Sequence, residues 1–243
     1  MKYALNYIHF VLYAAIYAGS YYGAYTVNNP PIECLLACVL GWSVYALVTV
    51  GHDCIHGSFS PFPYVNDALA FVCMSMLLMP RSRWKTEHSN HHADPGGAED
   101  NMLLEGGTWW SEMKHLLAAN QPHSLWDEVP KLPMFVSICL LPLYCLPLIW
   151  LSMMLSFMYL SLSTHILNPH LRLWEEKKPE DIAWNIFPQS HVYTFVAGGL
   201  NIHGCHHKNC KWTRSELMRE ALTPGYQTIN TCSAFTGLLW YRH

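Results

Sequence analysis

Charged residues are scarce in this sequence. Asp, Glu, Lys and Arg make up 13% of its 243 residues, about half the share usual in soluble proteins. The formal net charge is −3, which argues against a nucleic-acid partner, because such partners select strongly basic surfaces. Hydrophobic residues reach 51% and aromatic residues 14%. The composition therefore allows either one domain with a large core or a compact membrane protein.

Two familiar metal-binding motifs are also absent. The nine cysteines include no C-x-x-C pair, so we expect reduced thiols, and only Cys205 and Cys210 remain open as thiolate ligands, without zinc-type spacing. No His-Glu-x-x-His segment is present, which argues against a zinc protease. Histidine itself is abundant, since fifteen histidines outnumber the fourteen lysines and arginines. This excess of imidazole is the feature that a functional hypothesis must explain.

Apolar stretches that suit a bilayer alternate with polar segments. A span needs about 20 apolar residues, and the stretch at 134–167, interrupted by prolines, could form one over-long helix or a tight pair of crossings. We favour the pair, because it places 203–207 on the same side of the membrane as 51–57 and 86–92. The stretch at 64–80 is shorter and starts with the polar Asn66 and Asp67, so we expect a re-entrant or interfacial helix there. The predicted spans are 3–27, 32–50, 134–150 and 151–167.

Basic residues predict which side the polar segments face. The loop at 28–33 has no Lys or Arg, whereas basic residues such as Arg81, Lys85 and Arg214 flank the histidine-rich segments. By the positive-inside rule, the cytoplasmic segments are 51–63, 81–133 and 168–243. The expected fold is therefore one all-α domain over 1–243. It is an integral, multi-pass membrane bundle of about four spans plus one re-entrant or interfacial helix, with a cytoplasmic histidine-rich cap.

Eight histidines fall into three short clusters. The clusters are His52 and His56 in "HDCIH", His88, His91 and His92 in "HSNHH", and His203, His206 and His207 in "HGCHH". Helix positions three and four apart share a face, so each cluster aims its imidazoles at one point. Eight neutral donors are too many for one ion, but divided between two ions they leave each an open position. The pattern predicts two redox metal ions that handle dioxygen, although the spacing alone does not choose between iron, copper and zinc.

These clusters resemble the histidine boxes of the membrane fatty acid desaturase and hydroxylase superfamily. "GHDCIHGSF" (51–59) and "HSNHHADPG" (88–96) are similar to the first half of acyl-lipid desaturases, and "GGLNIHGCHH" (198–207) resembles the approach to their third box. The resemblance covers roughly 40–105 and 160–210. It implies a helical membrane fold and a non-haem centre of two iron ions held by histidines, with dioxygen as co-substrate.

Further residues are candidates around this centre. "STHILNPH" (163–170) resembles a region where many members carry one more histidine, which makes His165 the candidate ninth ligand. Asp53 is expected to hold the second N–H of a neighbouring imidazole, with ordinary capping or ion pairing as the alternative. His191 is a candidate for the same outer layer or for the surface. His9 has no partner at ligand spacing and is expected to be structural or solvated.

The resemblance implies a dioxygen-dependent oxidoreductase that introduces a double bond into a fatty acyl chain. The substrate partner is then a lipid or another acyl chain in the membrane. No His-Pro-Gly-Gly motif of a fused haem donor is present, so we expect electrons from a separate ferredoxin-type or cytochrome-type protein.

Two alternatives remain open. The compact length and "HHADPGGAED" (91–100) also resemble carotenoid ketolases and hydroxylases of the same superfamily, and oxygen insertion in place of desaturation would give an alcohol. The other alternative is a metal transporter without catalysis. It predicts ionisable residues buried within the spans, yet the apolar stretches hold almost none apart from His9 and Glu33 near their ends.

Overall fold

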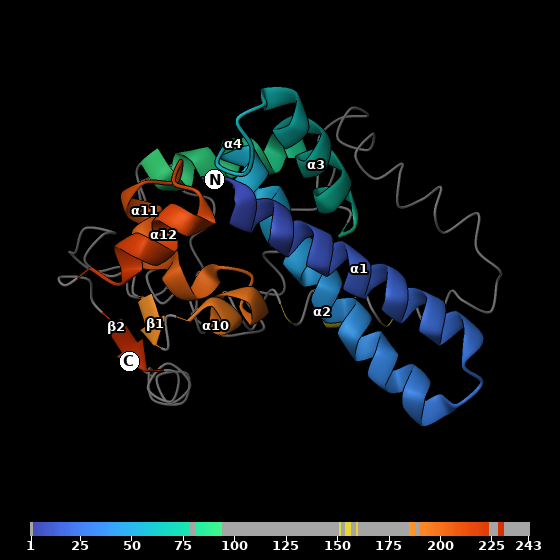
Figure 1. The fold of residues 1–243 in the computed structure, drawn as a ribbon. Coiled ribbons are helices and arrows are strands. Elements are labelled where there is room, and N and C mark those ends of the chain that lie inside the picture. The colour runs from blue at the N-terminus through green and yellow to red at the C-terminus, as the bar shows by residue number, and fades with distance from the viewer. Residues whose placement is uncertain are drawn as a thin grey trace, which may run out of the picture.

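The computed structural model describes residues 2–77, 81–93, 151, 154–156, 159, 185–187, 190–223 and 228–230. Two long helices, α1 (Ala4–Thr26) and α2 (Pro30–Ile55), run antiparallel, and the shorter helices gather at one end of this pair (Figure 1). The turn between α1 and α2 lies at the opposite end. The three histidine clusters lie on the elements at the gathered end, far from the turn that joins the long helices.

The start of α2 follows from its sequence. Asn29 is the N-cap, and its side chain accepts a hydrogen bond from the backbone N–H of Ile32. Pro30 and Pro31 fill the first two helical positions, where the missing N–H has no partner in any case. Glu33 accepts a hydrogen bond from the backbone N–H of Asn29 at 3.2 Å. These contacts turn the chain sharply after α1 and start the helix that carries the first histidine cluster.

The membrane-spanning prediction is supported in part. Within the described residues, α2 is the one helix that is both long and apolar enough to cross a membrane. Helix α1 covers nearly all of the predicted span 3–27, and α2 includes the predicted span 32–50 and continues to Ile55. The span at 134–150 and most of 151–167 lie outside the described residues, although Ser156 Oγ donates to the Gly41 carbonyl of α2 at 2.7 Å. The four-span bundle stays a prediction.

Helix α3 (Pro63–Ser75) packs against α2 and is followed by α4 (Arg81–Ala93), which carries the second cluster. At 13 residues, α3 is about 20 Å long, shorter than the apolar core of a bilayer, which is about 30 Å thick. The re-entrant or interfacial placement of the segment 64–80 stays a prediction.

The turn between α2 and α3 is fixed by two buried asparagines. Asn6 Nδ2 of α1 donates to the carbonyls of Ser58 and Phe59 at 3.0 and 2.9 Å. Asn66 of α3 accepts from the Ser60 N–H and donates to the Ser60 carbonyl, both at 2.9 Å. Every buried backbone group needs such a partner, so these side chains hold in place the backbone that follows the first cluster.

The C-terminal part consists of short elements. In chain order they are β1 (Asn185–Phe187), α10 (His191–Val196), the 3-10 helix η4 (Leu200–Ile202), α11 (His203–Lys208), α12 (Arg214–Ala221) and β2 (Thr228–Asn230). Strands β1 and β2 pair in parallel, with Ile186 opposite Ile229. The described residues are otherwise helical or irregular, so the all-α expectation needs one small correction. A three-residue strand is too short for hydrophobic alternation to reveal it.

Aromatic side chains of the long helices dock the end of α10. Tyr13 Oη of α1 donates to the Phe195 carbonyl at 2.7 Å. Trp42 Nε1 and Tyr45 Oη of α2 donate to the carbonyls of residues 196 and 197 at 2.9 and 2.8 Å. The last carbonyls of a helix have no partner within it, so three donors from α1 and α2 fix the segment that leads into the third cluster.

Candidate metal centre

The first cluster sits where α2 ends. His52 lies in the last turn of α2 and His56 is its C-cap, so the two rings project from the same face one turn apart. Their ring centroids are 4.8 Å apart. Gly57, in the left-handed region at φ +69°, ends the helix immediately afterwards, as helix C-termini commonly require. Both imidazoles therefore point off the end of α2 towards the gathered helices.

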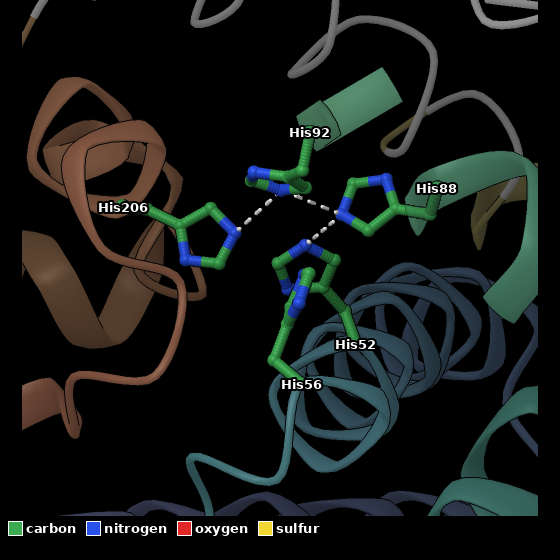
Figure 2. A group of neighbouring side chains, drawn as sticks. All are labelled: His52, His56, His88, His92 and His206. Atoms are coloured by element: carbon green, nitrogen blue, oxygen red, sulfur yellow. Dashed lines mark hydrogen bonds between the residues drawn. The ribbon is translucent and has the colours of Figure 1, made fainter. Parts of the chain in front are cut away.

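Five imidazoles from three helices converge at this point. They are His52 and His56 of α2, His88 and His92 of α4, and His206 of α11, and one ring nitrogen from each lies within 4.8 Å of all the others (Figure 2). His52 Nε2 is 2.8 Å from His88 Nε2, and His92 Nε2 is 3.2 Å from both His88 Nε2 and His206 Nε2. Segments more than a hundred residues apart in the sequence thus present nitrogens to one centre.

The remaining three cluster histidines lie directly beside this group. His207 Nε2 is 2.9 Å from His203 Nε2, and the His207 ring stacks on His92 with centroids 4.6 Å apart. The centroid of His91 lies 5.1 Å from that of His207. All eight histidines of the three clusters therefore form one continuous group, of which five surround one point and three lie next to them.

The spacing of the nitrogens suits a metal ion. Neighbouring ligand nitrogens with metal bonds of about 2.1 Å lie roughly 3 Å apart, which matches the observed 2.8–3.2 Å separations. His88 Nε2 lies close to two other Nε2 atoms, and a single ring proton cannot serve both. Within the described part of the chain, His56 Nε2 is buried and has no hydrogen-bond partner, and such polar atoms are costly to bury unless something binds them. The residues present fit a bound cation.

The surroundings of three cluster histidines keep their imidazoles neutral. Burial, together with the neighbouring imidazoles, lowers the pKa of His56 to about 2 and holds the pKa values of His88 and His206 well below 6.5. A neutral imidazole is the form that ligates metal. At neutral pH each of these three side chains therefore offers the lone pair of one ring nitrogen, and it does not have to lose a proton before it binds metal.

Asp53 lies where an outer-layer residue would lie. Its Oδ1 is 3.3 Å from His52 Nδ1, and because a carboxylate only accepts, His52 Nδ1 carries the proton. The lone pair of His52 is then on Nε2, which faces the other imidazoles. The second oxygen, Oδ2, accepts from Arg214 Nε at 2.7 Å, so the ion pairing expected as the alternative is present as well, and the outer-layer role of Asp53 stays a prediction.

The other candidates have different positions. His165 lies outside the described residues. His191 is exposed at the first residue of α10, which fits the surface alternative. Cys205 is buried and its Sγ accepts a hydrogen bond from Asn185 Nδ2, while Cys210 is half-buried. None of the six cysteines within the described residues forms a disulfide.

Arg214 is the residue near the centre that the sequence did not indicate. Its side chain is 2% exposed, although the sequence suggested only a basic cytoplasmic flank. His9, expected to be structural or solvated, is also buried and accepts from Arg214 Nη1 at 3.1 Å. No spacing rule links these two residues, because they are about two hundred positions apart.

The fatty acid desaturase family model matches residues 30–133, which include α2, α3 and α4 with the first two clusters. In this region the chain is similar to the fatty acid desaturase and hydroxylase superfamily. An oleate hydroxylase of Claviceps purpurea is 37% identical over 72 residues, 26% of this chain and 15% of the relative.

Two desaturases of this superfamily are similar to this chain over segments of comparable length. The omega-3 fatty acid desaturase of Caenorhabditis elegans is 38% identical over 85 residues, 34% of this chain and 19% of the relative. An acyl-lipid omega-3 desaturase (cytochrome b5) of Arabidopsis thaliana is 32% identical over 85 residues, 35% of this chain and 20% of the relative. The chain thus spans at most about a fifth of the length of these three relatives in the superfamily.

Proposed function

We propose that this chain is a dioxygen-dependent membrane oxidoreductase that introduces a double bond into a fatty acyl chain at a histidine-held centre of two iron ions. The observation that carries the proposal is the convergence of the five imidazoles on one point, extended by three more. Similarity to the superfamily adds the acyl chain and the oxidative chemistry to the proposal, since the relatives described above are fatty acid desaturases and a hydroxylase.

Each histidine has a defined task in this proposal. The ligands are His52, His56, His88, His91, His92, His203, His206 and His207, with His165 as the ninth. Bound iron supplies oxygen activation and hydrogen removal, which side chains alone do not provide. The buried imidazoles stay neutral and hold their nitrogens at fixed separations before the metal arrives. Asp53 keeps the His52 ring oriented, and His191 remains the weaker outer-layer candidate.

The long helices are the proposed membrane anchor. Apolar side chains on α1 are exposed, among them Val11 at 59% and Tyr22 at 69%, and Leu35 on α2 is 64% exposed. Exposed apolar patches mark lipid or protein contact. We propose that these faces contact lipid, that the chain is multi-pass with the histidine end on the cytoplasmic side, and that the acyl substrate enters from the bilayer.

The electron donor is proposed to be a separate protein. Two Arabidopsis thaliana relatives carry the donor in their names, one with cytochrome b5 and one with ferredoxin. Cytochrome b5 and ferredoxin are both small one-electron carriers, and carriers of this class can reduce an iron centre. A donor of either type would serve this chain.

Hydroxylation is the second candidate, favoured by the similarity to an oleate hydroxylase. The same hydrogen removal followed by oxygen insertion would give a hydroxy fatty acid. The carotenoid and transporter alternatives stay predictions without a structural observation in their favour.

The test is fatty acid profiling of a desaturase-deficient host that expresses the full chain. The wild type is expected to yield an acyl chain that lacks two hydrogens, and His207→Ala is expected to yield none. Lys208→Ala is the matched control, because this adjacent side chain is exposed and pairs with Glu220 at 2.9 Å. A product with one added oxygen would establish the hydroxylase instead. An unchanged lipid profile from an iron-loaded, membrane-inserted chain would reject both.

A further inference from the structure

Arg214 is buried in a pocket of hydrogen-bond acceptors drawn from both long helices. Its Nε donates to Asp53 Oδ2 at 2.7 Å and its Nη2 donates to Thr49 Oγ1 at 3.2 Å, both on α2. Its Nη1 donates to His9 Nδ1 at 3.1 Å and to Tyr13 Oη at 3.3 Å, both on α1. The guanidinium therefore lies at one fixed place, with an acceptor for each of its three nitrogens.

The Arg214 backbone is anchored as well. Its N–H donates to Asn6 Oδ1 at 3.1 Å, and the preceding Thr213 forms a capping box with Glu216. Since Asn6 also holds the turn after the first histidine cluster, the start of α12 is tied to the same part of α1. Main chain and side chain together leave the guanidinium no alternative position.

The Asp53 carboxylate lies between this guanidinium and a cluster histidine. One oxygen faces Arg214 and the other faces His52 Nδ1. We propose that Arg214 is a positioning residue of the metal centre, which acts through Asp53 to fix the ring orientation and tautomer of His52. This inference rests on the proposed function, because it assigns Arg214 a task only if His52 binds metal.

Stability alone does not account for this arrangement. A buried ion pair loses so much hydration that apolar side chains of similar volume often serve the fold as well or better. The arginine is also next to the centre, since Arg214, Asp53, His52, His203 and His206 all line one cavity of about 20 Å³. The Arg214–Asp53 ion pair thus borders imidazoles on α2 and on α11, where it can orient the rings that would bind metal.

The experiment measures metal affinity and not turnover. The full-length wild type, Arg214→Gln, Arg214→Lys and Asp53→Asn are purified without metal and titrated with Co²⁺ in competition with a chelator. Visible absorption of bound Co²⁺ reports the ligand geometry. Loss of an outer-layer partner typically weakens metal binding about 10- to 100-fold, and this loss is expected for Arg214→Gln and Asp53→Asn. Arg214→Lys is expected to restore part of the affinity and to shift the absorption bands.

The double variant Arg214→Gln/Asp53→Asn distinguishes positioning from separate structural damage. If Arg214 acts through Asp53, the Co²⁺ affinity of the double variant equals that of the single variant with the lower affinity. The effects of substitutions at residues that contact each other are not additive. A double variant whose loss of Co²⁺ affinity equals the product of the two single losses would overturn the proposal. Asp53→Asn nearly preserves side-chain shape, so it remains informative where Arg214→Gln fails to fold.

Glu220→Ala is the structural control. It removes the ion pair with Lys208 from the far end of the same helix, away from the Arg214 contacts, and is expected to leave Co²⁺ affinity unchanged. Folded Arg214→Gln that binds Co²⁺ as tightly as the wild type would overturn this inference alone. A wild-type chain that binds no Co²⁺ would overturn the proposed function together with it.

Discussion

His92 Nε2 and His206 Nε2 lie 3.2 Å apart although 114 residues separate them in the sequence. One is on α4 and the other on α11, and neither helix is long enough to be stable alone. Their meeting depends on α1 and α2, which hold the turn after α2 through Asn6 and the end of α10 through Tyr13. The long helix pair is thus the frame on which the histidine clusters are assembled.

Removing His88 should strongly weaken metal binding at the five-histidine group. His88 Nε2 lies within 3.2 Å of two other imidazole nitrogens, so His88→Ala is expected to weaken metal binding by more than about 100-fold, beyond the loss typical of outer-layer residues. Metal content per chain, measured after dialysis, checks this. Full retention of metal by a folded His88→Ala protein would show that His88 is not a ligand.

The metal-free protein should lose stability as the pH falls below about 6.5. The pKa of His56 is lowered from 6.5 to about 2 by burial and by neighbouring imidazoles, and those of His88 and His206 are lowered too. Below pH 6.5 these histidines bind protons in the unfolded chain but not in the folded cluster, so acid favours unfolding. Each such histidine contributes up to about 1.4 kcal/mol per pH unit.

The check is the thermal midpoint of the metal-free protein at pH 7.5 and 5.5. His56→Asn should show a smaller difference between the two midpoints than the wild type, because the variant lacks one group that binds a proton only in the unfolded chain. An equal difference in both proteins would show that His56 does not contribute to the pH dependence.

Gly198→Ala should destabilise the protein more than Gly57→Ala. Both glycines have positive φ, +62° and +69°, which costs a non-glycine residue about 1–2 kcal/mol. Only at Gly198 would the added Cβ also collide, at 2.7 Å from Thr49 Oγ1, whereas nothing lies within 4 Å at Gly57. We expect about 3 kcal/mol for Gly198→Ala and about 1 kcal/mol for Gly57→Ala. Equal losses in thermal unfolding would contradict the close approach of Gly198 to α2.

Asn6→Ala should be more damaging than a cap deletion at the far end of the helix pair. The Asn6 side chain is 1% exposed and makes three hydrogen bonds, to residues 58, 59 and 214. Its loss leaves buried backbone groups unpaired and should cost about 2 kcal/mol or more. Asn29→Ala removes an exposed cap and should cost about 1 kcal/mol. Thermal unfolding of both variants compares them, and a smaller loss for Asn6→Ala would contradict the anchoring role.

The sequence predicted the long helices because length and hydropathy define them. The expected stretch 3–27 matches α1 closely, but α2 continues past 50 to Ile55. The hydrogen bonds of a helix do not depend on side-chain polarity, so the helix extends through the polar first cluster. The predicted interfacial segment 64–80 likewise became a helix that ends at Ser75.

The eight cluster histidines were predictable because helical spacing puts them on common faces, and the structure brings them together. Arg214 was not predictable in this way. A buried arginine and a solvated one look the same locally, and its partners His9, Tyr13 and Asp53 lie more than 160 positions away. Only the fold brings those acceptors to one guanidinium.

The measurement that tests the central claim most directly is iron content with oxygen uptake. The full chain, purified in detergent and loaded anaerobically with Fe²⁺, is freed of excess metal, analysed, and then exposed to dioxygen with a chemical reductant. Two tightly bound iron ions per chain and oxygen consumption that His88→Ala lacks are the predicted result. A chain that retains no iron, or only zinc, and consumes no oxygen when reduced would contradict it.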